Sequence, residues 1–120
     1  MTECTYKYNN KSHDLVCQGL ASEEGEDKSV CAAVTVLLHT LAFDIEESND
    51  MCAEKEIKVE DGYYHIKVKP IEGAEEQMEF LFGAFVNGLY MLSEDPKLKK
   101  RITLNVSYDE EPSGDADSEI

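Results

Sequence analysis

A cysteine at the expected start of a helix is the residue of this sequence best placed for chemistry. A polar, acidic, glycine-containing stretch, residues 21–28, precedes Ser29, Val30 and Cys31. Ser29 can cap a helix there, because its hydroxyl can accept a hydrogen bond from a free backbone N–H of the first turn. Cys31 would then lie in that turn, where free N–H groups and the helix dipole favour a thiolate. Cys31 is therefore a candidate nucleophile; the alternative is a buried cysteine that packs as a small hydrophobic residue.

A nucleophilic thiol needs a base within hydrogen-bond reach, so the three histidines decide what Cys31 could do. His39 follows eight residues later on the same expected helix, which is about 12 Å along the axis. His13 opens a strand that ends near Leu20, and seven extended residues separate the two by roughly 23 Å. His65 lies on a hairpin strand and is expected to face away from the core, where it is either exposed or at an interface. The sequence therefore offers no histidine that is well placed to serve Cys31.

Hydrophobic periodicity predicts the elements that hold these residues. Alternation predicts strands over residues 4–8, 13–19, 57–60, 63–68 and 101–108, and helical spacing predicts helices over 29–43 and 74–93. Asp61-Gly62 predicts a tight turn inside the middle hairpin. The order ββαββαβ indicates an α/β (α+β) domain, in which one sheet of about five strands carries both helices on one face.

Two details of the helices bear on the site. The apolar stripe of the first helix is expected to consist of Val30, Ala33, Val34, Leu37, Leu38 and Leu41. Cys31 falls at the flank of this stripe, about 80° from its centre, where a side chain can face a cleft beside the core. In the second helix, Gly83 and Gly88 cost helix stability, which indicates that they allow a close approach to the sheet.

The residues around Cys31 resemble a known signature. The run SVCAAVT, residues 29–35, with Gly25 and Asp27 ahead of it, is similar to the motif of the bacterial ribosomal-processing cysteine proteases. That family reads roughly G-H-A, a glycine-rich loop, and then G-x-D-I-V-C-A-A-V-S. The resemblance extends over about residues 3–109 in the order and length of the elements. It implies that Cys31 occupies the position of the nucleophile.

The histidine half of the signature differs. The G-H-A position reads Gly19-Leu20-Ala21 here, so leucine stands where the family has its base. The loop is also rearranged, with fewer residues before Gly25 and one extra residue between Asp27 and Cys31. The resemblance further implies an α/β sandwich, a homodimer and a ribosomal protein as substrate.

Composition limits the partners and the compartment. The chain has 120 residues with 26 acidic and 11 basic side chains, for a net charge of -15. This charge argues against direct nucleic-acid binding and suits either a basic partner or solubility alone. No apolar run could span a membrane, the N-terminus carries no secretory signal, and the four cysteines form no C-x-x-C pair. We therefore expect a cytoplasmic protein with reduced thiols and no cofactor or metal.

The predicted organisation is a single domain over residues 1–109, followed by a disordered acidic tail over residues 110–120. Three functions agree with the sequence. The first is a divergent, catalytically impaired protease relative that binds a basic peptide or protein. The second is an active cysteine protease that trims a ribosomal protein with a base other than the family's. The third is a small acidic interaction protein in which Cys31 belongs to the core.

Overall fold

The computed structural model describes residues 2–19, 25–60, 62–97 and 102–109. Within these ranges the elements are β1 (Thr2–Asn9), β2 (Ser12–Gln18), α1 (Gly25–Glu47), a short 3-10 helix (Asn49–Met51), β3 (Cys52–Glu60), β4 (Tyr63–Pro70), α2 (Glu75–Glu94) and β5 (Ile102–Asp109). The predicted order of strands and helices is confirmed. The predicted acidic tail, residues 110–120, lies outside the described residues.

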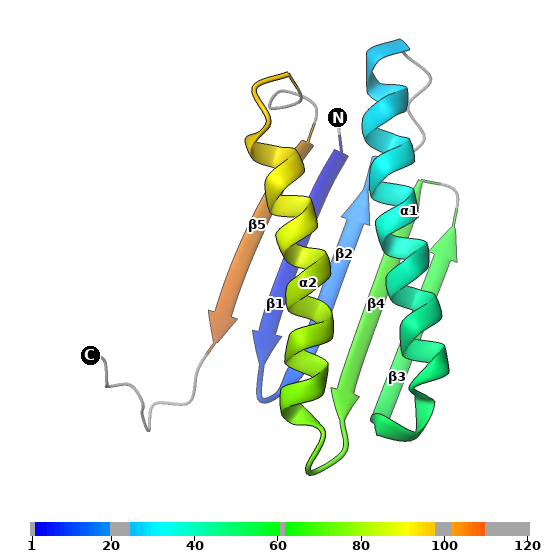
Figure 1. Ribbon diagram of the computed structural model, residues 1–120, viewed down its shortest axis with the longest axis vertical. Coiled ribbons are helices and arrows are strands. Elements are labelled where there is room, and N and C mark those ends of the chain that lie inside the picture. Colours follow the sequence, from blue (N-terminus) through cyan, green and yellow to red (C-terminus); the bar gives the residue numbers. More distant parts are fainter. Residues whose placement is uncertain (1, 20–24, 61, 98–101, 110–120) are drawn as a thin grey trace, which may run out of the picture.

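The five strands form one sheet in the order β3-β4-β2-β1-β5 (Figure 1). β1 and β2 form a hairpin whose turn holds Asn10 and Lys11 at φ angles of 56° and 67°. This left-handed backbone is the one that a tight hairpin turn requires. β5 pairs in parallel with β1, so that Tyr8 lies beside Tyr108, and β5 forms one edge of the sheet. The first and last of the five described strands in sequence order are therefore neighbours in the sheet.

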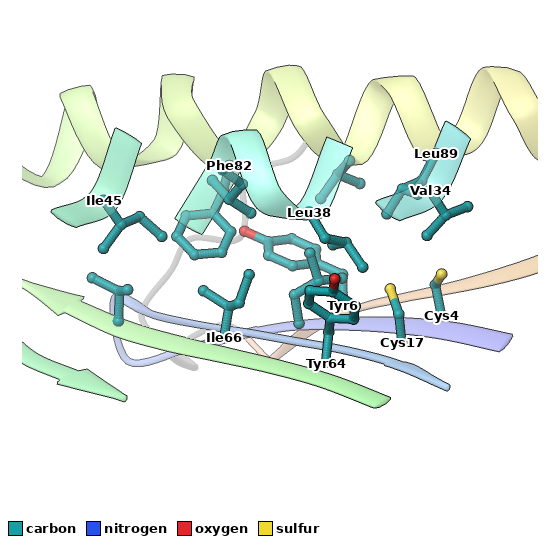
Figure 2. Packing of buried hydrophobic residues seen from close by; sticks show 14 of the residues in the cluster. Cys4, Tyr6, Cys17, Val34, Leu38, Ile45, Tyr64, Ile66, Phe82 and Leu89 are labelled. Carbon is teal, nitrogen blue, oxygen red and sulfur yellow. The ribbon is translucent and has the colours of Figure 1, made fainter. Parts of the chain in front are cut away.

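Both helices cover the same face of the sheet, as predicted (Figures 1 and 2). The core lies between the two layers and combines inward residues of β1, β2 and β4 with one stripe from each helix. It includes Tyr6, Leu15, Cys17, Val34, Leu38, Leu41, Ile45, Ile66, Val68, Met78, Phe82 and Leu89. Neither helix is both long and apolar enough to cross a membrane, as far as the described ranges go.

The first helix is longer than predicted. α1 begins at Gly25 and ends at Glu47, whereas the sequence pattern predicted residues 29–43. Its first residues are polar and acidic, so no apolar repeat signals that the helix has already begun. The predicted loop over residues 21–28 is therefore wrong from Gly25 onward.

The two glycines of α2 also differ from the prediction. A Cβ atom at Gly88 would lie 3.3 Å from the side chain of Leu37, which belongs to α1. Gly88 therefore allows α1 to approach α2, rather than allowing α2 to approach the sheet. A Cβ atom at Gly83 would meet nothing within 4 Å, so no close packing explains the glycine there.

Candidate functional site

Cys31 lies on the buried stripe of α1. The stripe consists of Cys31, Val34, Leu38, Leu41 and Ile45, which recur at intervals of three and four residues. The Cys31 side chain is 9% exposed, so its predicted position at the flank of the stripe is wrong. The observed stripe is centred closer to Cys31 than the predicted one, because Ile45 is fully buried whereas Ala33 and Leu37 are only half-buried.

The position of Cys31 in the helix also differs from the prediction. Because α1 begins at Gly25, Cys31 is in the second turn, beyond the first four N–H groups that lack a partner within the helix. Ser29 is inside the helix and is not its N-cap, and Gly25 and Asp27 belong to its first turn. The backbone therefore does not offer Cys31 the free N–H groups that the sequence predicted.

Gly19 ends β2 in a conformation that suits glycine. Its φ angle is 85°, and its N–H donates a hydrogen bond of 3.0 Å to the carbonyl of Gly62 in the turn between β3 and β4. This bond fixes where the chain leaves the sheet on its way to α1. Leu20 and Ala21, the other predicted site residues of this segment, lie outside the described residues.

His65 is on the wrong face of the sheet to serve Cys31. Its neighbours Tyr64 and Ile66 are buried between the sheet and the helices, so His65 points to the opposite face. There its Nε2 atom is hydrogen-bonded to Asp14 Oδ1 at 2.8 Å. The sheet itself therefore separates this imidazole from α1, in agreement with the prediction that His65 faces away from the core.

His13 lies at the beginning of β2, whereas the chain enters α1 from the other end of that strand (Figure 1). Five residues of extended chain, roughly 16 Å, separate His13 from Gln18. The His13 ring is buried, its Nδ1 atom is hydrogen-bonded to the Tyr6 hydroxyl at 2.6 Å, and burial lowers its pKa to about 4. This histidine belongs to the core.

His39 is two turns beyond Cys31 on α1, about 12 Å along the axis. The prediction of a surface residue is correct, since His39 is exposed, but its Nε2 atom is hydrogen-bonded to the Tyr64 hydroxyl. The sequence could not predict this bond, because the partners belong to different elements. The three histidines thus lie in three separate places, each with a partner of its own.

The other three cysteines have the surroundings of structural residues rather than of nucleophiles. Cys4 and Cys17 face each other across the β1–β2 hairpin and are fully buried, with their sulfur atoms directed toward the helices (Figure 2). The hydrogen bond with Cys4, and then burial, raise the pKa of the Cys17 thiol above its usual value. Cys52 is partly buried, and its thiol donates to the carbonyl of Ser48 at 3.7 Å. Among the described side chains, no three His, Cys, Asp or Glu residues lie close enough to hold a metal ion.

The fold that carries Cys31 is of a known class, similar to that of solved ribosomal processing proteases. Prp, an essential ribosomal processing protease from Staphylococcus aureus, was solved in complex with a substrate peptide. Its TM-score is 0.68 at 16% identity, over 88% of this chain and 99% of that chain. The same protease with a covalently linked product peptide gives a TM-score of 0.62.

A second solved structure is SMU.848 from Streptococcus mutans, with a TM-score of 0.70 and 25% identity. It covers 91% of this chain and 99% of that chain. No family model matches the sequence, and no curated protein matches it. The likeness in structure therefore defines the fold.

Proposed function

We propose that this protein is a catalytically impaired relative of the ribosomal-processing cysteine proteases that binds a basic peptide or protein without cleaving it efficiently. The observation that supports this most is the distribution of the histidines. His13 is in the core, His39 is two turns along α1, and His65 is on the far face of the sheet. Leu20 stands at the sequence position of the family's histidine.

A thiol without a base reacts slowly for two reasons. Only its small thiolate fraction attacks the peptide carbonyl, and no group then protonates the leaving amine. Positioned acid–base assistance is typically worth about 10²–10⁴-fold in rate. We therefore expect this protein to turn over a peptide that resembles the family's substrate more slowly, by at least this factor, than an enzyme with an intact Cys–His pair does.

Charge and fold support a basic peptide as the partner. The net charge of -15 attracts a cationic chain, and the similar S. aureus protease was solved with a substrate peptide. A ribosomal protein is a basic partner of this kind. We further propose that the protein acts in the cytoplasm, where ribosomal proteins are made. A homodimer, which the family resemblance implies, is also part of the proposal.

A turnover assay tests the catalytic part. The substrate is a peptide that resembles the substrate of the family, and the proteins are the natural chain, Leu20→His and Cys31→Ala. We expect negligible cleavage by the natural chain and a gain with Leu20→His that is lost in the double variant with Cys31→Ala. Efficient cleavage by the natural chain that Cys31→Ala abolishes would contradict the proposal and require a base other than the three histidines.

Binding is measured separately, by calorimetry with the same peptide on the natural chain and on Cys31→Ala. We expect both to bind, because the proposal assigns Cys31 no covalent role. A peptide of the same length with neutral residues in place of its lysines and arginines is the control. Equal binding of the neutral peptide would contradict the proposed basic partner.

The burial of Cys31 favours a second candidate, a small acidic interaction protein in which this thiol is part of the core. The 9% exposure of Cys31 and its place on the packed stripe agree with this function. The two candidates differ in the effect of Leu20→His. If the histidine restores no cleavage and the family's peptide does not bind, the second candidate is the better one.

A further inference from the structure

A groove lies between α2 and the end of the β1–β5 pair. In Figure 1 the ends of β1 and β5 lie at the opposite end of the molecule from the beginning of α1, whose second turn contains Cys31. Its volume is about 310 Å³, which is within the range of small-ligand sites. Tyr6, Tyr8 and Tyr108 line it from the sheet, and Glu79, Gly83 and Asn87 line it from α2. None of these residues belongs to the site proposed above.

The three tyrosine rings form walls that meet at steep angles. The Tyr108 ring is inclined by 80° to that of Tyr6 and by 61° to that of Tyr8, with both centroid distances at 6.1 Å. Tyr6 is buried, whereas Tyr108 is 60% exposed, so the groove reaches from the core to the surface. The groove therefore combines an aromatic interior with an open mouth.

The polar groups around the rings are largely engaged within the protein. The Tyr6 hydroxyl is hydrogen-bonded to His13, and the Tyr8 hydroxyl donates to Glu79 Oε2 at 3.0 Å. Because burial lowers the pKa of His13 to about 4, this ring places no positive charge behind the groove at neutral pH. Among the described residues, Glu79 forms no ion pair with a lysine or arginine. A visiting group meets the side chains of the three tyrosines, the Asn87 amide and one negative charge.

Gly83 keeps the groove open. Glycine in the middle of a helix is unfavourable relative to alanine, so its presence needs a reason. Gly88 has one, since a Cβ atom there would press on Leu37, but a Cβ atom at Gly83 would meet nothing within 4 Å. A side chain at position 83 would fill free space in the groove without disturbing the packing of α2. The glycine is explained if that space has to accept a ligand.

We infer that this groove binds an organic cation, either the head of a small alkylammonium compound or the side chain of lysine or arginine in a peptide. Aromatic faces attract such cations, and the carboxylate at the rim adds a direct charge interaction. The overall charge of -15 raises the local concentration of cations near the surface. The site does not depend on the proposed function, because it uses neither Cys31 nor the segment around Leu20.

The first test compares choline with its neutral isostere 3,3-dimethylbutan-1-ol on the full chain, following the tyrosine ring signals by NMR. We expect choline to shift the signals of the three groove tyrosines in a saturable way and the neutral alcohol to bind at least about fivefold more weakly. Equal binding of the two compounds, or no binding of either choline or the peptides below, overturns the inference.

Gly83→Leu is the decisive variant, because it fills the groove and leaves the net charge unchanged. We expect it to unfold at the same or a higher temperature than the natural chain and to bind choline at least about fivefold more weakly. General attraction to an acidic surface would survive this change. Unaltered affinity in folded Gly83→Leu therefore overturns the inference.

Two matched pairs of variants distinguish the contribution of the residues that line the groove from nonspecific effects. Tyr108→Leu should weaken binding, whereas Tyr90→Leu should not, since Tyr90 is a similarly exposed tyrosine of α2, at 56%, outside the groove. Glu79→Gln should weaken binding more than Glu76→Gln, although both remove one negative charge from the same helix. Equal effects within either pair contradict the assigned role of Tyr108 or Glu79.

The source of the cation is resolved with three capped tripeptides, glycine–X–glycine, in which X is lysine, arginine or norleucine. Tighter binding of the lysine or arginine peptide than of choline supports a peptide side chain as the ligand. Tighter binding of choline supports a small alkylammonium compound. Binding of the norleucine peptide as tightly as the lysine peptide overturns the inference, because it shows that the charge is not recognised.

Discussion

The two glycines of α2 predict different outcomes for the same substitution to alanine. Alanine in the middle of a helix is more favourable than glycine by about 0.5–1 kcal/mol, and this gain applies equally at both positions. The surroundings differ, because the new methyl group at Gly83 meets nothing within 4 Å, whereas at Gly88 it lies 3.3 Å from both methyl carbons of Leu37. Only Gly83→Ala therefore realises the full gain.

The magnitudes follow from these contacts. We expect Gly83→Ala to raise the free energy of unfolding by about 0.5–1 kcal/mol, which corresponds to roughly 2–5 °C in Tm for a domain of this size. At Gly88 the contacts are shorter than the optimum of about 3.5–4.0 Å between carbon atoms. Leu37 must shift to relieve them, and overpacking of this kind typically costs about 1–3 kcal/mol. Gly88→Ala should therefore be neutral or destabilising.

Thermal and urea unfolding, followed by circular dichroism at neutral pH, measure both variants against the natural chain. The difference between the two variants is the informative quantity, since their change in helix propensity is the same. If Gly88→Ala stabilises as much as Gly83→Ala, the close contact between α1 and α2 is not as described. A clear loss of stability in Gly83→Ala would refute the open space at that position.

The remaining predictions concern the buried histidine and the thiols. The folded-state pKa of His13 is lowered to about 4, so the unfolded chain binds a proton that the folded chain does not between pH 6.5 and about 4. The free energy of unfolding should fall by up to about 3 kcal/mol from this residue as the pH drops through this window. Urea titrations at several pH values measure this dependence, and the free energy of unfolding of His13→Phe should depend less steeply on pH. Cys52 should react with iodoacetamide in the native protein, whereas the fully buried Cys4 and Cys17 should not; mass mapping that finds these two modified as readily as Cys52 would contradict their burial.

Much of the fold follows from local patterns. Alternation in β1, β2, β4 and β5 and the three–four spacing of α2 predict these elements to within two residues, because each buries one regular face. β3 begins at Cys52, five residues before the predicted strand. The hairpin turn at Gly62 follows from its neighbours in sequence in the same way, and its φ angle is 75°. Features set by a residue's own neighbours along the chain are therefore predictable here.

The start of α1 and the partners of the histidines were not predictable on that basis. Polar residues before Ser29 continue the helix without an apolar repeat, and this moved Cys31 from the first turn to the second. The bond between His13 and Tyr6 depends on how two strands pair, and that between His39 and Tyr64 on how a helix lies on the sheet. The partner of Gly88 likewise belongs to another helix. These contacts arise only when separate elements pack.

The parallel pairing of β1 with β5 has a consequence for how the chain folds during synthesis. β1 leaves the ribosome before the other four strands of the sheet, yet its neighbour on one side, Ile102–Asp109, leaves after them. Until then, one edge of β1 presents unpaired N–H and C=O groups, as any open strand edge does. Contacts between segments so distant in sequence also slow folding. Nascent chains that stop short of residue 102 should therefore be the forms most prone to associate through β1.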